Sequence, residues 1–246
     1  MKKGIIIVIL ASVFLSSHAF GHTILERFQF DLTWTGIKAG EAVLEAIDDG
    51  QCIHFISKTY SAEWVSLFYR VENMIESTVK AANANSSQDA FAYIPSHYSV
   101  KMREGRHRRD KEVFFDRTAR QAAYINHIEK ERASFPINDS TFDPLSGFFY
   151  VRRIPLEVGK SVFVDVFDSK KLYKLEVKVL KKESIKTSLG TFQTIVIKPI
   201  MQSEGIFYRK GDILIWLTDD EKKIPVLIKI KASLGSISAT LVGGQY

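Results

Sequence analysis

The sequence is poor in the residues that build disulfides, metal sites and catalytic motifs. Its 246 residues include one cysteine, Cys52, so an internal disulfide and an amino-terminal lipid anchor are both excluded. The five histidines after residue 21 include no pair spaced two or four residues apart, so no metal site is expected. No spacing of carboxylates points to glycoside chemistry. These absences argue against an enzyme and against a bound metal or organic cofactor.

Long hydrophobic runs are also lacking, except at the start of the chain. Lys2 and Lys3 precede an apolar run at 5–15, and small residues follow as far as Gly21, which is the pattern of a secretory signal peptide (1–21) cut after Ala19 or Gly21. The run is shorter than the roughly 20 residues of a membrane span, although an uncleaved anchor is the alternative. We therefore expect a periplasmic protein that does not span the membrane when mature.

Charge of one sign is not abundant. Loss of Lys2 and Lys3 lowers the formal net charge from +6 to +4. This mild excess permits attraction to a lipid or an anionic envelope glycan, whereas export argues against nucleic acid as a partner.

What the sequence does contain is a repeated two-residue alternation. Phe28, Phe30, Leu32 and Trp34 alternate with polar residues, which predicts a half-buried strand. About twelve such segments follow one another through hairpin-length joins, with turns at 49–50 and 104–105 among the clearest. The fold class expected is mainly all-β: one strongly curved antiparallel meander that forms an open or half barrel.

One stretch interrupts this pattern and predicts a short central helix packed on the sheet. Asp143 suits the N-cap, Pro144 suits the first helical position, and Leu145, Phe148, Phe149 and Arg152 recur on one face. A second, shorter helix is expected within 61–69. The domain expected after the leader is a single β-rich unit, 22–246, divided into a first meander (23–131), a linker and helix (132–153) and a second meander (159–242).

Several motifs, in this order, resemble a known family. They are Trp34-Thr35-Gly36-Ile37-Lys38-Ala39-Gly40-Glu41, Asp143-Pro144-Leu145-Ser146 with Arg152, Gly190-Thr191-Phe192, and Ile215-Trp216-Leu217-Thr218-Asp219 followed by Ile224-Pro225-Val226. Together they are similar to the exported bacterial envelope proteins grouped as domain of unknown function 3108. The resemblance implies an exported, β-rich domain and transfers no activity or ligand.

Cations cluster around the predicted turn at 104–105. Lys101, Arg103, Arg106 and Arg108 are candidate ligand-binding residues, because arginines in a group can hold phosphates or sugar carboxylates. The simpler interpretation is a solvated hairpin whose charges discourage edge pairing.

Ser146 and Arg152 raise the question of a nucleophile with an oxyanion partner. No Gly-x-Ser-x-Gly elbow surrounds Ser146, so capping is the better interpretation of this serine. Arg152 is expected to be a buried arginine that forms an ion pair with a carboxylate, and it is also a candidate ligand-binding residue.

Two function classes remain. In the first, the curled sheet binds an apolar or amphipathic envelope molecule such as a lipid, and Trp34 and Trp216 are candidate wall residues. In the second, the interior is packed solid and the protein is a non-enzymatic interaction or assembly factor that uses its basic hairpin or an edge strand.

The first testable prediction concerns cleavage of the expected signal peptide, residues 1–21. We expect amino-terminal sequencing of the protein from the soluble envelope fraction to begin at Phe20 or His22. Retention of Met1 in that fraction would show that the leader is not cleaved.

Overall fold

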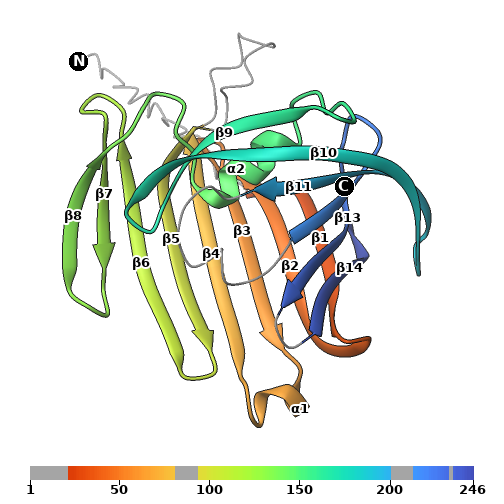
Figure 1. Cartoon of the computed structure of the whole chain (residues 1–246). Helices are drawn as coiled ribbons and strands as arrows, with labels where there is room; N and C mark the ends of the chain where they lie inside the picture. Colours follow the sequence, from red (N-terminus) through yellow and green to blue (C-terminus); the bar gives the residue numbers. More distant parts are fainter. Residues whose placement is uncertain (1–21, 81–93, 201–212, 233–234) are drawn as a thin grey trace, which may run out of the picture.

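The described part of the chain folds into one antiparallel sheet with two short helices (Figure 1). The computed structural model describes residues 22–80, 94–200, 213–232 and 235–246. The strands and helices are β1 (Thr23–Trp34), β2 (Ile37–Asp48), β3 (Cys52–Ser61), α1 (Glu63–Ser66), β4 (Val71–Lys80), β5 (Pro95–Glu104), β6 (His107–Asp116), β7 (Gln121–Asn126), β8 (Glu131–Pro136), α2 (Pro144–Val151), β9 (Ser161–Asp168), β10 (Lys171–Thr187), β11 (Gly190–Ile200), β12 (Ile213–Thr218), β13 (Pro225–Ala232) and β14 (Gly235–Gln245).

Two meanders meet at β1, which pairs with β2 on one side and with β14 on the other. The strand order is β8-β7-β6-β5-β4-β3-β2-β1-β14-β13-β12-β11-β10-β9, so β8 and β9 are the two edges. The sheet curves strongly and is not closed by strand pairing, as Figure 1 shows. The prediction of a curved, half-barrel meander with a central helix is confirmed.

The edge strands β8 and β9 are not paired with each other, and other contacts join the two ends of the sheet. Lys111 on β6 donates to Asp168 on β9 at 2.6 Å, and this pair is almost fully buried. The ring of Phe167 packs at centroid distances of 6.3 Å from Phe115 and 5.6 Å from Phe135. The backbone of Phe142 adds two hydrogen bonds of 2.8 Å to β9. The barrel-like shape is therefore completed by an ion pair, aromatic contacts and this short backbone bridge.

Helix α2 lies on the concave side of the sheet, between β9 and β4 (Figure 1). Its N-cap is Asp143, whose carboxylate accepts from the backbone amides of Leu145 and Ser146, and Pro144 occupies the first helical position. Both assignments were predicted and are confirmed. An eight-residue helix is marginal alone, so burial against the sheet must stabilise it.

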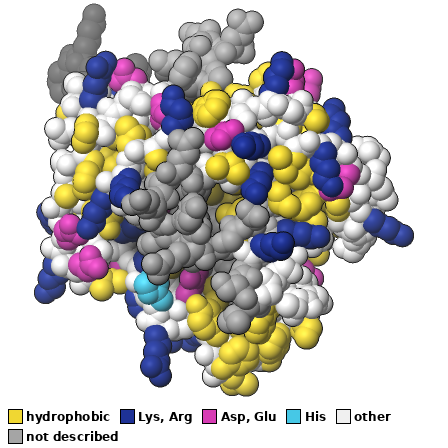
Figure 2. All heavy atoms as spheres, viewed as in Figure 1, with side chains coloured by type: hydrophobic (Ala, Val, Ile, Leu, Met, Phe, Trp, Pro, Cys, Tyr) yellow, Lys and Arg dark blue, Asp and Glu magenta, His cyan; other side chains and the backbone are white. Residues whose placement is uncertain are grey.

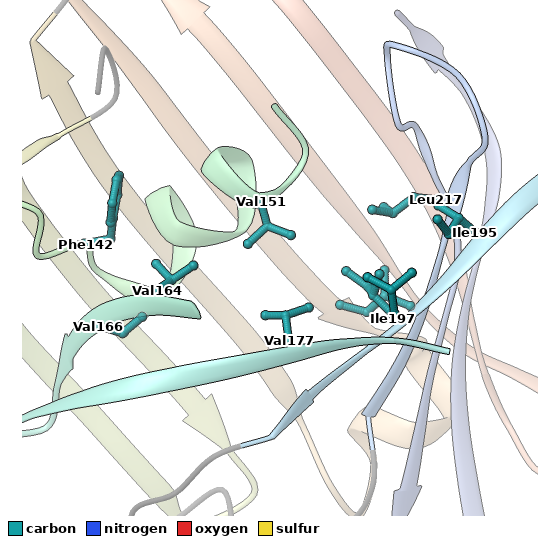
Figure 3. Close-up of a cluster of buried hydrophobic side chains, with 10 residues drawn as sticks. Phe142, Val151, Val164, Val166, Val177, Ile195, Ile197 and Leu217 are labelled. Atoms are coloured by element: carbon teal, nitrogen blue, oxygen red, sulfur yellow. The ribbon is translucent and has the colours of Figure 1, made fainter. Parts of the chain in front are cut away.

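Three hydrophobic clusters surround α2. The first contains Val151 and side chains of β9 to β12, and Figure 3 shows Val151 facing Val164 and Val177 across this space. The second joins Phe149 to β1, β2, β3 and β14, and the third joins Leu145 to β5, β6 and β7. The helix is thus the shared centre of the core.

The structure corrects three predictions. The described residues contain fourteen strands, whereas about twelve were expected. The supposed linker at 132–142 includes most of β8, which we missed because its polar residues hide an alternating exposure pattern typical of an edge strand. The second helix exists but spans only Glu63–Ser66. The leader 1–21 and the loop expected at 81–90 lie outside the residues that the structure describes.

The structure also corrects the prediction of which side chains of α2 are buried. Phe149 is the buried ring, 4% exposed and stacked on Phe55 with 3.8 Å between centroids, whereas Phe148 is half-buried. Helical spacing could not show which of these two adjacent rings is more deeply buried, because hydrophobic clusters lie on several sides of α2.

This difference gives a stability prediction. Phe149→Ala should lower the free energy of unfolding by about 3 to 5 kcal/mol, because it removes a close-packed ring. Phe148→Ala should cost clearly less, since part of that ring already faces solvent. Denaturant melts of the two variants measure both values, and equal losses would contradict the assignment of Phe149 as the main anchor.

Candidate ligand-binding surfaces

The first candidate surface is the part of the concave face beside α2. Leu145 and Phe148 of the helix are only half-buried there, although they pack on the core clusters. Strands of both meanders add further half-buried apolar side chains, namely Ala42, Ile75, Met102, Tyr173, Leu175, Ile213, Ile228 and Ala239. The result is a partly uncovered apolar wall, which we call the concave wall.

Cationic side chains lie at one side of the concave wall. Arg109 is half-buried and lies opposite Met102 in the β5–β6 register, on the same face as Lys111 and Tyr98. Lys111 is committed to Asp168 and to the hydroxyl of Ser169 at 2.9 Å. Arg109 has no ion-pair partner among the described residues. Burial, together with the nearby carboxylate of Asp168, raises the pKa of Tyr98 well above its usual value, so this phenol is neutral.

Asp143 fixes the start of α2 to the sheet. Its carboxylate accepts from the hydroxyls of Ser77 on β4 at 2.6 Å and of Ser146 at 2.7 Å, in addition to the two backbone amides. Ser146 also accepts from the amide of Asp143, which completes a reciprocal capping box. The capping role predicted for Ser146 is confirmed.

Arg152 fixes the other end of α2. Its guanidinium forms a bidentate pair with Glu26 on β1, at 2.8 and 2.9 Å, and donates to the carbonyls of Lys222 and Lys223. The rings of Phe28 and Phe149 lie 4.9 and 5.3 Å from the guanidinium carbon. The prediction of a buried arginine answering a carboxylate is confirmed, and a ligand role for Arg152 stays a prediction.

The second candidate surface is a groove of about 530 Å³ that crosses β3 to β6 on the convex face. The floor of the groove is formed along its middle by three residues that are paired across neighbouring strands, Asn73, Met102 and Arg109. Their side chains point to the opposite, concave face. The residues before and after each of them point outward and form the two walls. These outward wall residues, with Ile128 from the next turn, are Tyr60, Glu72, Arg103, Arg108, Met74, Lys101 and Asp110.

The groove brings together three of the four predicted hairpin cations. Lys101 and Arg108 are exposed, while Arg103 is half-buried and its Nε is buried without a hydrogen-bond partner in the described part of the chain. Arg106 stands apart at the tip of the hairpin, outside the groove. Glu72 and Asp110 were not among the predicted residues, because cross-strand neighbours cannot be assigned before the register is known.

The two candidate tryptophans lie on opposite faces. Trp34 follows Phe30 and Leu32 on the concave side and is 37% exposed at the end of β1. Trp216 alternates with the inward-facing Ile215 and Leu217, so it lies on the convex face in a small cluster with Val196 and Leu227. Trp216 is 6% exposed, and its Nε1 donates to Glu183 at 2.7 Å. It is therefore not a wall residue of the concave face.

The remaining polar residues do not gather into a metal site. Within the ranges the structure describes, no three His, Cys, Asp or Glu side chains are placed to hold a metal ion. His54 is hydrogen-bonded between Asp49 at 2.9 Å and Glu76 at 3.1 Å, as an ordinary strand histidine would be. The same ranges contain no helix of the length and apolarity required to cross a bilayer.

Comparisons with known proteins agree with this fold. The family model described as "Protein of unknown function (DUF3108)" matches residues 29–242, so the chain belongs to that family. A crystal structure of a beta-barrel-like protein of domain of unknown function DUF1849 from Brucella abortus is similar at a TM-score of 0.51 and 12% identity. That match covers 89% of this chain and 96% of the other, and at such identity it shows the fold alone. No curated protein matches in sequence.

The buried cap predicts a pH effect on stability. Burial raises the pKa of the Asp143 carboxyl above 3.8, against the opposing effect of its hydrogen bonds. The carboxyl proton of Asp143 is therefore retained to a higher pH in the folded state than in the unfolded state. The stability that this protonation contributes is complete below the pKa of the unfolded state and is lost as pH rises through the pKa of the folded state. The free energy of unfolding of the wild type, relative to Asp143→Asn, should therefore fall as pH rises above 3.8. Urea melts at a series of pH values measure this slope, and a difference that grows with pH would contradict it.

Proposed function

We propose that this DUF3108 protein is an exported envelope protein that binds an apolar or amphipathic molecule, such as a lipid, on its concave wall. The observation that carries the proposal is the set of half-buried apolar side chains left on that wall by α2 and by strands of both meanders. The signal-like pattern of residues 1–21 supports export.

Energetics favour a ligand at this position. Covering apolar surface is worth about 25 cal/mol per Å², and small-molecule sites are typically concave, mostly apolar and equipped with few polar groups. The wall receives Met102 from one meander and Ile213 and Ile228 from the other. A bound hydrocarbon chain would thus cover side chains that the fold itself leaves partly exposed.

Arg109 suits the polar end of an amphipathic ligand. It has no ion-pair partner in the described ranges and lies opposite Met102, a wall residue. A carboxylate or phosphate beside Arg109 would form a charge-assisted pair, while its hydrocarbon part follows the wall. A fatty acid is the simplest molecule with this distribution of charge and apolar surface.

The convex groove supports a second candidate, an interaction or assembly factor. The buried Nε of Arg103 lacks an acceptor among the described residues, and Lys101 and Arg108 add positive charge to the same groove. Such a groove suits an acidic protein segment or an anionic glycan.

Probe binding tests the first function. Purified protein should yield a co-purified lipid by mass spectrometry and should bind a fluorescent fatty acid. Phe148→Ser should weaken that binding about tenfold or more, because a half-buried ring is removed from the wall. Arg109→Ala should weaken binding of the fatty acid but leave a matched fatty alcohol nearly unaffected.

A matched control separates wall effects from general loss of apolar surface. Phe163 is 55% exposed and points away from Val162 and Val164, so Phe163→Ser should leave probe binding unchanged. Absence of both co-purified lipid and probe binding in the wild type would remove the lipid-binding proposal. Binding of an acidic peptide or glycan that is lost in Arg103→Ala would then support the second candidate.

A further inference from the structure

An exposed apolar protrusion lies at the end of the sheet where β3 is joined to β4. Helix α1 and the residues after it bury only Val65, while Leu67 is 88% exposed, Phe68 63%, Tyr69 47% and Trp64 41%. Figure 2 shows hydrophobic side chains gathered at the lower end of the molecule, where Figure 1 places α1. We call residues 64–69 the apolar tip.

The apolar tip is held firmly, although its side chains face solvent. The indole of Trp64 donates to the carbonyl of Lys38 at 3.0 Å, and the hydroxyls of Ser61 and Ser66 lie 2.8 Å apart. At its far end the amide of Gly105 donates to the carbonyl of Arg70 at 2.9 Å. Connecting two antiparallel strands requires none of the large exposed side chains, so their presence calls for a partner outside the fold.

The surface next to the apolar tip extends it in two ways. On the side of β1 and β2, the turn carries Ile37, 61% exposed, and Trp34, so the apolar area continues. On the other side Tyr69 lies against Gly105, where a Cβ would meet its ring at 2.7 Å. The tip of the β5–β6 hairpin is therefore in direct contact with the apolar tip.

That hairpin brings positive charge to the same end. Arg106 and Arg108 are exposed, and neither forms an ion pair with a carboxylate of the described residues. Arg108 donates to the carbonyls of Gly105 and His107, both at 2.8 Å, which keeps it at the turn. The nearby cations Arg70 and Lys38 are paired, with Glu72 at 3.0 Å and with Asp31 and Glu41 at 2.8 Å. Glu63, which directly precedes the apolar tip, is an exposed carboxylate, and the two hairpin arginines outnumber it.

We infer that this end of the molecule docks on the surface of an anionic lipid bilayer. Trp and Tyr favour the level of the headgroups, Leu and Phe gain from entering the acyl boundary, and arginines are attracted to anionic lipid. A protruding turn whose apolar side chains splay outward suits a fluid surface, which adapts to its shape. This docking does not depend on ligand binding at the concave wall.

Vesicle flotation tests the inference. The purified protein should float with vesicles that contain phosphatidylglycerol and less with vesicles of phosphatidylcholine alone, and added salt should reduce flotation. Leu67→Ser combined with Phe68→Ser should lower the bound fraction about tenfold or more, since two exposed side chains that enter the lipid are lost. Arg106→Ala combined with Arg108→Ala should lower binding to the anionic vesicles alone.

Matched controls use equivalent residues elsewhere on the surface. Phe163→Ser with Leu189→Ser removes two apolar side chains that are 55% and 42% exposed, and Lys171→Ala with Lys174→Ala removes two exposed cations. Both control variants should float like the wild type. The inference is overturned if the wild type does not float with anionic vesicles, if Leu67→Ser with Phe68→Ser floats unchanged, or if the tip variant loses a protein partner while vesicles are never bound. Fatty-acid binding that persists in the tip variant would show that the two surfaces act separately.

Discussion

The packing of α2 against the concave face of the sheet depends on one buried carboxylate, that of Asp143. A strongly curved sheet leaves a concave face that must be filled, and α2 fills it only if its unpaired amides are satisfied inside the core. Asp143 does this for Leu145 and Ser146, and its bond to Ser77 fixes the helix to β4. A buried charge is tolerated here because four donors surround it.

Arg152 performs the corresponding task at the other end of the helix. It joins α2 to β1 through Glu26 and to the turn before β13 through the carbonyls of Lys222 and Lys223. Each end of α2 is therefore tied to strands of the first meander, while Val151 packs on the second. The helix sets the distance between the two halves, and with it the width of the concave wall.

Much of this fold follows from sequence, because its signals are local. The alternation at 28–34, the turn at 49–50 and the Asp143-Pro144 cap each depend on neighbours within a few residues. The long-range pairs were not predictable in the same way. Ser77 and Asp143 are 66 positions apart, and Glu26 and Arg152 are 126 apart, so only the folded register brings them together.

The candidate surfaces also could not be predicted in detail, because they depend on how strands pair. The cations of the β5–β6 hairpin were identified by composition, but their division between faces follows from pairing: Arg109 turns inward, and Arg103 and Arg108 turn outward. Trp216 was misplaced because β12 has apolar residues on both of its faces, so its sequence does not indicate which residues point inward. The structure places Trp216 in a second cluster on the convex face.

The two edges of the sheet, β8 and β9, meet without a ladder of backbone hydrogen bonds between them. Lys170 beside β9 pairs with Glu131 on β8, and Phe167 on β9 packs on Phe135 of β8. Further along the seam, Lys111 of β6 pairs with Asp168, and the backbone of Phe142 forms two hydrogen bonds with β9. Separating two edges joined by side chains disrupts fewer hydrogen bonds than opening a closed barrel would. The seam between β8 and β9 therefore depends mainly on side-chain contacts, whereas both meanders depend on continuous ladders of backbone hydrogen bonds.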